Sequence, residues 1–316
     1  MKLSGFSFVK NATKLYYPIR QSIESILPIV DEFVIAVGDC DADDNTLEEI
    51  RKIDSEKVKI INTVWDIEKY KHGTENAHQT DIAKQACSGD WLIYLQADEV
   101  IHEKYLPVIQ NRCGALLKDT RVEGLLFKYL HFYGDYWHHL VNHGSYPKEI
   151  RIVRNDPDIH SYISAQSFRR IPNFDGKDYR QQEGTYKLKV APIDVYIYHY
   201  GGCRPPRFFQ KKRRSLDTIH KGEQWAEEVY KDQAEEFDFG PLKRTRKFNG
   251  SHPKVMESRI AAFDWKEKLN YEDSYTPNRP LFKHEKMKNR MLTFVEQNIL
   301  GGKRLFAYTN WEIIDV

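Results

Sequence analysis

The sequence predicts an α/β protein in which a mostly parallel sheet is flanked by helices, followed by a mainly helical C-terminal part. Strand and helix patterns alternate through the first third of the chain, which is typical of a parallel sheet. Polar clusters follow three of the predicted strands, at positions 10–11, 39–44 and 96–99. Because ligands bind at the carboxyl ends of the strands in such sheets, these clusters mark the expected site.

Composition narrows the class of protein before any motif is considered. The 316 residues carry a formal net charge of +2, which argues against nucleic acid as the main partner. No segment approaches the roughly 20 apolar residues of a membrane-spanning helix, and the N-terminus does not resemble a signal peptide. The four cysteines form no CxxC pair, which argues against a zinc site or a disulfide framework, and we expect a cytoplasmic location.

The elements of the first third follow from the spacing of apolar residues. Thr74 is a possible N-cap of one helix and Gly89 a possible stop for it. The predicted strands are 3–9, 32–38, 57–63 and 90–95. The predicted helices are one with Leu15, Ile19, Ile23 and Ile26 on one face and Pro18 in its first turn, and three more over 45–53, 74–89 and 103–118.

Later elements are less regular, and the character of the chain changes at Arg204 to long charged helices with loops between them. A helix over 281–299 is the clearest of these, because Gly301 and Gly302 follow it directly. The predicted strands of the middle third are 122–132, 148–154 and 193–200.

The acidic turn Gln96–Glu99 raises the question of what two adjacent carboxylates do after a buried strand. Magnesium or manganese would take one or two such carboxylates and complete its shell with phosphate oxygens and water. Alternatively the turn caps the next helix, which Glu99 and Glu103 would do near a helix N-terminus. Spacing alone leaves both interpretations open.

The segment GDWLIYLQADE resembles the DxD segment of glycosyltransferase family 2, whose members have the GT-A fold. Asp98 matches the second Asp of that motif, and Gln96 stands where the first Asp normally does. The stretch SFVKNATKLYYPIRQSIESILPIVDEFVIAVGDCDADDNT is similar to the family's opening, and FNGSHPKVMESRI and FVEQNILGGKRLFAYTNWEI look like segments of bacterial members. The resemblance covers essentially the whole chain.

This resemblance implies a Rossmann-like GT-A domain over 1–203 and a mainly helical extension over 204–316. Within the domain, 1–120 would bind the nucleotide sugar and 121–203 would provide the acceptor and metal part. The donor, a nucleotide-diphosphate sugar, would be bound by Asn11, Asp39, Asp43, Gln96 and Asp98.

A divalent metal, Mn²⁺ or Mg²⁺, is also implied, with Asp98 and His199 as its ligands. His199 lies in VYIYHYGG, which matches a late strand of GT-A enzymes. Taken alone, a histidine between tyrosines is more simply a core residue. A neutral imidazole nevertheless suits manganese, provided that its other ring nitrogen has an orienting partner.

The inverting reaction of the family requires a general base for the acceptor hydroxyl. The segment in which relatives carry an acid, Ser161–Arg169, contains no Asp or Glu, and Ser164 stands in the expected place. Glu149 and Asp158 are therefore the predicted catalytic residues. A turn at Asp156-Pro157-Asp158 is the alternative explanation for the second of them.

Two further stretches each allow more than one interpretation. The loop Tyr133–Pro147, rich in aromatic residues and histidine, is either a wall that stacks on an acceptor sugar or a packed lid. The basic run Lys211–Ser215 is either a solvated helix face or a contact with the diphosphate, an anionic membrane surface or nucleic acid.

We therefore expect a metal-dependent, inverting glycosyltransferase that serves surface polysaccharide or glycolipid assembly. Its partners would be a nucleotide sugar and a carbohydrate or glycolipid acceptor, with peripheral contact to the inner face of a membrane left open. One alternative is a non-catalytic nucleotide- or sugar-binding relative, because Gln96 and Ser164 replace acids. A nucleotidyltransferase is disfavoured, since VKNATKLY lacks a Gly-rich phosphate loop.

Overall fold

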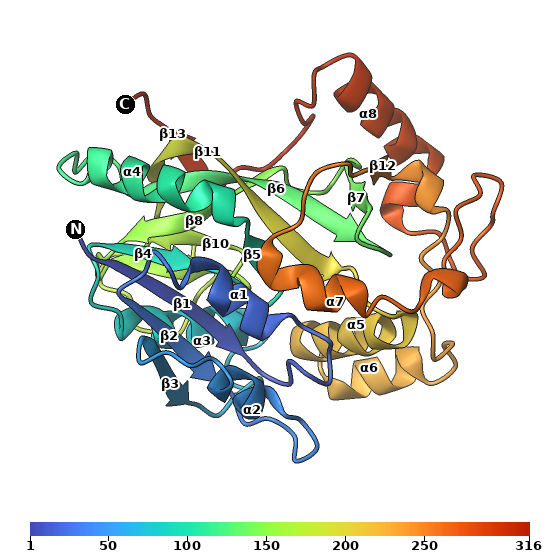
Figure 1. Ribbon diagram of the computed structural model, residues 1–316, viewed down its shortest axis with the longest axis horizontal. Coiled ribbons are helices and arrows are strands. Elements are labelled where there is room, and N and C mark those ends of the chain that lie inside the picture. Colours follow the sequence, from blue (N-terminus) through green and yellow to red (C-terminus); the bar gives the residue numbers. More distant parts are fainter.

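Four parallel strands form the N-terminal part of the sheet in the computed structural model, which describes residues 1–316 (Figure 1). Their order across the sheet is β3-β2-β1-β4, and every neighbouring pair is parallel. The predicted α/β class is therefore confirmed. The bounds are β1 Leu3–Val9, β2 Glu32–Val37, β3 Val58–Asn62 and β4 Trp91–Tyr94.

Helices cover both faces of this parallel part, and the strands supply side chains to both. Successive residues of a strand point to opposite faces, so β2 contributes to two cores. Phe33 and Ile35 pack with residues of α1, Ile19–Ile26. Val34 and Ala36 pack in a second core that includes Ala83 of α3, Thr74–Gln85. Burial on both faces explains why β2 is apolar from Phe33 to Val37.

The sheet continues beyond β4 through strands of mixed direction. Next to β4 lies β8, Lys148–Arg154, which is antiparallel to it and to β6, Gly124–Tyr133. The long β11, Tyr186–Gly202, follows and is parallel to β6. Short β5, Glu99–Ile101, pairs antiparallel with β11, so that Glu99 lies opposite His199. This pairing brings the acidic turn after β4 to the end of β11.

The C-terminal residues pack on the far end of the sheet and share a third apolar core with it. Tyr198 and Tyr200 of β11 lie in this core with Trp265 and Leu242. No helix is both long and apolar enough to cross a membrane. The remaining elements are α2 Thr46–Arg51, α4 Leu106–Leu116, α5 Pro206–Lys221, α6 Glu223–Tyr230, α7 Glu257–Ala261, α8 Met287–Asn298, β7 His138–Leu140, β9 Ile159–Tyr162, β10 Ser167–Arg170, β12 Arg246–Lys247 and β13 Trp311–Ile313.

Several element boundaries differ from the predicted ones for local reasons. The N-cap position of α3 is held by Gly73 with a φ of 85°, so Thr74 is the first helical residue and not the cap. The same helix ends at Gln85, four residues before Gly89. The backbone N–H of Gly89 instead donates to Ser4 Oγ at 2.8 Å, which ties the start of β4 to β1. The predicted helix 281–299 begins only at Met287.

Glu99 has a structural role that the helix-cap interpretation did not foresee. Its carboxylate accepts hydrogen bonds from Arg151 Nε at 2.7 Å and Arg151 Nη2 at 2.8 Å, and both side chains are fully buried. Tyr129 Oη and the backbone N–H of Gln96 also donate to it, at 2.8 and 3.1 Å. Glu99 lies in β5 and caps no helix, so the acidic turn is anchored to β8 by this pair.

Replacing Arg151 with Met is expected to lower the free energy of unfolding by about 3–5 kcal/mol, because it leaves the Glu99 carboxylate buried and uncompensated. Urea denaturation followed by circular dichroism measures the change. The matched control is Arg121→Met, which removes an exposed partner of Asp119 and should cost no more than about 1 kcal/mol. Equal losses in the two variants would contradict the anchoring role of the buried pair.

Candidate functional site

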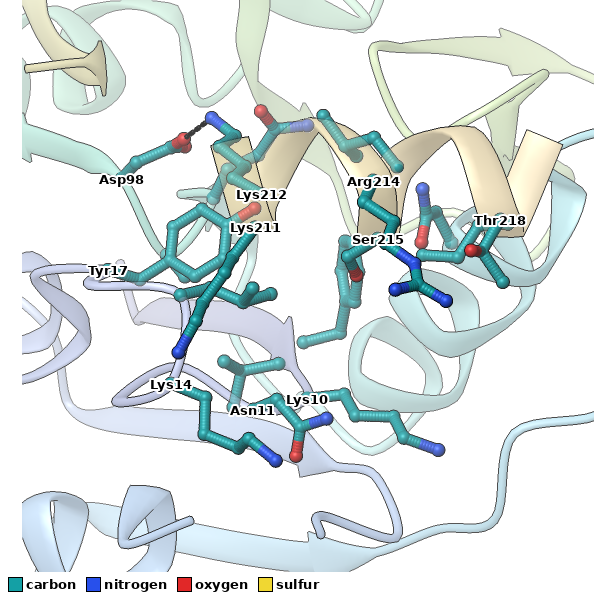
Figure 2. A pocket seen from close by; sticks show the side chains of 18 of the residues that line it. Lys10, Asn11, Lys14, Tyr17, Asp98, Lys211, Lys212, Arg214, Ser215 and Thr218 are labelled. Atoms are coloured by element: carbon teal, nitrogen blue, oxygen red, sulfur yellow. Dashed lines mark hydrogen bonds and ion pairs between the residues drawn. The ribbon is translucent and has the colours of Figure 1, made fainter. Parts of the chain in front are cut away.

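A cavity of about 880 Å³ opens at the carboxyl ends of β1 and β4, where the sequence predicted a ligand. Figure 2 shows α5 on one side of it and the loop after β1 on the other. The acidic turn and the end of β11 close it between them. The cavity lining includes Phe8, Lys10, Asn11, Lys14, Tyr17, Asp41, Asp43, Trp65, Gln96, Asp98, Tyr146, Ser164, Gln166, His199, Lys211, Lys212 and Arg214.

The basic run on α5 lies along the cavity, although two of its side chains, Lys211 and Arg214, are also exposed to solvent. Lys211, Lys212 and Arg214 all line the cavity, and the fourth cation, Arg213, packs its guanidinium on the ring of Phe237 at 4.9 Å. The helix starts with Pro206 at its first position, where a missing N–H costs nothing. One side chain of this helix, Lys212, extends to the acidic turn and contacts Asp98 there.

Asp98 is the most tightly held acid of the cavity. Lys212 Nζ lies 2.8 Å from Asp98 Oδ2, drawn as a dashed line in Figure 2, and also donates to the carbonyl of Gly201 at 3.0 Å. His199 Nε2 and Arg204 Nη2 are 3.6 and 3.7 Å from the same oxygen. Burial alone would raise the pKa of Asp98, but Lys212, followed by His199 and Arg204, lowers that pKa well below its usual value.

Lys212, the partner of Asp98, is also largely buried and in contact with a neighbouring ring. Its side chain is 12% exposed, and its ammonium lies 5.2 Å from the centre of the Tyr17 ring. Burial lowers the pKa of Lys212 to about 8, and the neighbouring Asp98 opposes that shift. The group therefore carries its charge at pH 7.

Arg204 adds a second buried cation behind Asp98. The side chain is fully buried, stacks on Tyr17 at 4.7 Å and donates from Nη1 to the carbonyl of Leu15. Its Nε and Nη2 atoms have no hydrogen-bond partner. A guanidinium with unused donors, buried beside one carboxylate, leaves an excess of positive charge at this point of the cavity.

The predicted metal ligands are adjacent, but their surroundings do not fit a divalent cation. Asp98 and His199 supply one oxygen and one nitrogen, and no group of three or more His, Cys, Asp or Glu side chains converges anywhere in the chain. Magnesium and manganese favour octahedral shells rich in oxygen. Here the ammonium of Lys212 and the guanidinium of Arg204 already face Asp98.

Three of the residues predicted to bind the nucleotide sugar, Asn11, Asp39 and Asp43, have different positions. Asn11 lines the cavity with a φ of 54°, and its Oδ1 accepts from the backbone N–H of Asp41 at 2.8 Å. Asp43 also lines the cavity and pairs with Lys14 at 2.7 Å. Asp39 is not part of the lining. It accepts from the backbone N–H of Trp65 and pairs with Lys10, each at 2.9 Å.

Gln96, which replaces the first acid of the DxD pattern, supports a strained loop. Its Nε2 donates to the carbonyl of Ala165 at 3.0 Å. Ile163 and Ala165 have φ values of 61° and 60°, which are unfavourable for residues with a Cβ and most of all for a β-branched one. Ser164 lies between them on the cavity lining, so the position where an acid was expected does face the cavity.

Neither predicted catalytic carboxylate lies on the cavity lining. Glu149 is 3% exposed, and its Oε1 accepts from Ser167 Oγ at 2.7 Å. Asp158 lies by Arg170, 3.4 Å from Nη1, in the turn that was the alternative explanation. The structure does not bring either residue together with Asp98, and their assignment as general bases stays a prediction.

The aromatic loop Tyr133–Pro147 is mostly packed against the C-terminal part of the chain. Tyr136 is 1% exposed in the third apolar core, and His138 hydrogen-bonds to Asp135 at 2.9 Å. Only Tyr146 of this loop reaches the cavity. The structure therefore agrees with the packed interpretation over most of the loop.

Sequence reasoning missed several residues of the site. Lys14 and Trp65 line the cavity but belong to no recognisable motif. The sequence did not identify Arg204 as a residue of the site either, because an isolated arginine after Gly201-Gly202-Cys203 is ordinarily exposed to solvent. Lys212 was visible only as part of a basic run, whose spacing does not say which member faces inward.

No family model matches this chain, and no curated protein does. Among solved structures, a Staphylococcus aureus TarS fragment, residues 1–349, matches at 16% identity over 69% of this chain and 65% of that one, with a TM-score of 0.35. Glucosyl-3-phosphoglycerate synthase from Mycobacterium tuberculosis, solved with Mg²⁺ and uridine diphosphate, matches at 19% identity over 42% of this chain and 43% of that one, with a TM-score of 0.27. At these values the matches carry no argument about activity.

The buried carboxyl of Glu149 makes stability depend on pH. Burial raises its pKa to about 7, so between its ordinary value and pH 7 the folded chain binds more protons than the unfolded chain. Stability contributed by this group is complete at low pH and is lost as the pH rises through 7. Relative to wild type, Glu149→Gln should therefore gain about 2–3 kcal/mol between pH 5 and pH 8.

Urea unfolding of both proteins at pH 5, 6, 7 and 8 measures this gain. The matched control is Asp158→Asn, whose carboxylate is partly exposed beside Arg170, and whose difference from wild type should not grow with pH in this way. A constant difference between Glu149→Gln and wild type would show that the carboxyl is not protonated in the folded chain.

Proposed function

We propose that this chain is a glycosyltransferase whose donor is a nucleoside-diphosphate sugar. The observation that carries this assignment is the cationic cavity at the carboxyl ends of β1 and β4. Its volume of about 880 Å³ lies in the range of small-molecule sites, about 300–1,000 Å³. The cations that line it are Lys10, Lys14, Lys211, Lys212 and Arg214.

These cations are not equally available to a ligand. Lys10 pairs with Asp39 at 2.9 Å, and Arg214 with Glu223 at 3.4 Å. Lys211 has no acidic partner within ion-pair distance, and Lys212 shares Asp98 with Arg204. The excess positive charge is therefore concentrated between α5 and the acidic turn, which is where a diphosphate would bind.

The nucleoside would lie at the opposite end, beside Phe8 and Trp65. Their ring centres are 6.0 Å apart, and both residues line the cavity. The indole Nε1 of Trp65 is buried over Gly38 and has no hydrogen-bond partner, so the ring itself, and not its N–H, is what this end offers to a base. Asn11 and Asp43, which the resemblance assigns to donor binding, also line the cavity.

The transferred sugar would lie toward Tyr146, Ser164 and Gln166, on the side of the cavity bounded by the strained loop. In the reaction, the acceptor oxygen forms a bond to the anomeric carbon while the bond from that carbon to the diphosphate breaks. The electron pair leaves on the diphosphate, and a general base takes the acceptor proton. Inversion and a polysaccharide or glycolipid acceptor rest on the sequence resemblance alone.

A non-catalytic binding protein is the second candidate, favoured by the pairing of the acids on the cavity lining. Asp41 and Asp43 both pair with Lys14 at 2.7 Å, and Asp98 pairs with Lys212. A carboxylate held by a cation is a weak base. Release of free sugar and nucleoside diphosphate from a donor, or transfer to any acceptor, would exclude this candidate.

Calorimetric titration with uridine, guanosine, adenosine and thymidine diphosphates and their glucose and N-acetylglucosamine conjugates tests the donor assignment. One nucleotide series should bind with a Kd in the micromolar range, about −8 kcal/mol. The same donors incubated with the protein and assayed for nucleoside diphosphate release should show slow turnover without an acceptor. If no compound of the panel binds, the glycosyltransferase assignment fails.

Gly201→Ala should weaken that binding at least tenfold, about 1.4 kcal/mol. A Cβ on Gly201 would collide with the His199 ring and lie 2.9 Å from Asp98 Oδ2, so both side chains must move. Gly114→Ala is the matched control, because a Cβ there meets nothing within 4 Å. Unchanged affinity in Gly201→Ala would show that the donor does not bind beside Asp98.

A further inference from the structure

We propose that Lys212 takes the place of the divalent metal beside Asp98, so that the diphosphate of the donor binds without any metal ion. This inference rests on the proposed function, since it takes a nucleoside diphosphate as the ligand. It differs from the sequence-based expectation, in which Asp98 and His199 hold Mn²⁺ or Mg²⁺. Four independent features of the cavity lead to it.

The first feature is the lack of a second carboxylate. In a DxD pattern two acids flank the metal position, but here the first is Gln96, whose amide is engaged with the carbonyl of Ala165 at 3.0 Å. The adjacent Glu99 is used by Arg151. Asp98 is thus the one carboxylate of the turn that faces the cavity.

The second feature is the position of the Lys212 ammonium. Its Nζ lies 2.8 Å from Asp98 Oδ2 and 3.0 Å from the carbonyl oxygen of Gly201. A lysine ammonium has three N–H donors, and these two contacts use two of them. Because Lys212 lines the cavity, the third donor is available to a phosphate oxygen. A metal bound to Asp98 would have to displace this ammonium.

The third feature is the balance of charge around Asp98. The single negative charge faces two cations, since Arg204 Nη2 is 3.7 Å from the same carboxylate oxygen. Arg204 is fully buried and two of its nitrogens lack hydrogen-bond partners, so this cation cannot turn away into solvent. A divalent ion added here would meet two like charges at close range, whereas a diphosphate would meet a net positive one.

The fourth feature is that the Lys212 side chain is held in place and that the adjacent lysine, Lys211, has no acidic partner. Lys212 is fixed by the Tyr17 ring at 5.2 Å and by its place on the 16-residue helix α5. The adjacent Lys211 is exposed, has no acidic partner and points into the cavity in Figure 2. Two consecutive lysines from one helix therefore offer charge to the two phosphates, one from a largely buried position and one from an exposed position.

The metal and lysine mechanisms predict opposite effects of removing the Asp98 carboxylate. If a metal bridges Asp98 and the diphosphate, Asp98→Asn should abolish binding. If Lys212 contacts the diphosphate directly, the same change removes a repulsive charge, and binding should tighten by about threefold or more. Lys212→Met should weaken binding at least tenfold. Lys221→Met, an exposed lysine on the same helix outside the cavity, is the matched control.

The experiment is calorimetric titration of the intact chain and these three variants at pH 7 with uridine diphosphate, guanosine diphosphate and inorganic pyrophosphate. Each titration is made once with EDTA and once with MnCl₂. We expect wild-type affinities within about threefold of each other in the two buffers. We also expect no effect of Lys221→Met. Circular dichroism confirms that each variant is folded, and Asp98→Asn supplies the decisive comparison should Lys212→Met not fold.

Three results would overturn the inference: binding that requires manganese, loss of binding in Asp98→Asn, or binding in EDTA that a folded Lys212→Met leaves unchanged. The absence of binding by all three probes would also overturn it. Pyrophosphate separates this inference from the donor assignment. If pyrophosphate binds in EDTA and depends on Lys212 while no nucleotide binds, the lysine site stands and the glycosyltransferase proposal fails.

Discussion

A carboxylate and a guanidinium, both without contact with solvent, join the acidic turn to the middle of the sheet. Glu99 accepts two hydrogen bonds from Arg151, and the backbone of Gln96 is tied to the same carboxylate. Burying such a pair is costly unless nearly every donor and acceptor is used, as it is here. The cavity depends on this constraint, because the position of Asp98 follows from that of its neighbour. Of the two adjacent acids, one is structural and the other faces the cavity.

The sequence was sufficient to predict the framework of the molecule. Apolar runs such as FVIAV are typical of strands buried on both faces, and their alternation with helices predicts a mostly parallel sheet, whereas the order β3-β2-β1-β4 is seen only in the structure. The ends of β1 and β4 then had to meet at one edge, so Asn11 and Asp98 were predictable as cavity residues. His199 was reached only through the resemblance, yet it lies 3.6 Å from Asp98.

The charge balance of the site was not predictable, because it depends on contacts between distant parts of the chain. The sequence KKRRS is compatible with a solvent-facing helix and with a cavity wall. Which of its side chains face the cavity depends on where α5 lies in the fold. Arg204 is buried because the chain turns sharply after β11, which no local pattern indicates. Conversely, Glu149 and Asp158 looked available in sequence, but Ser167 and Arg170 already engage them. Local patterns identify strands well and identify ionic partners poorly.

The separation of Asp98 and Lys212 by 114 residues has a consequence for how the protein is made. Synthesis proceeds from the N-terminus, and domains begin to fold as they leave the ribosome. When β1 to β4 have emerged, Asp98 has neither Lys212 nor Arg204 beside it, and the wall formed by α5 does not exist. The cavity is therefore completed only after β11 and α5 have been translated. A growing chain that stalls before residue 204 has Lys10 and Lys14 but lacks Arg204 and α5, and with them every cation that lies beside Asp98 in the complete fold.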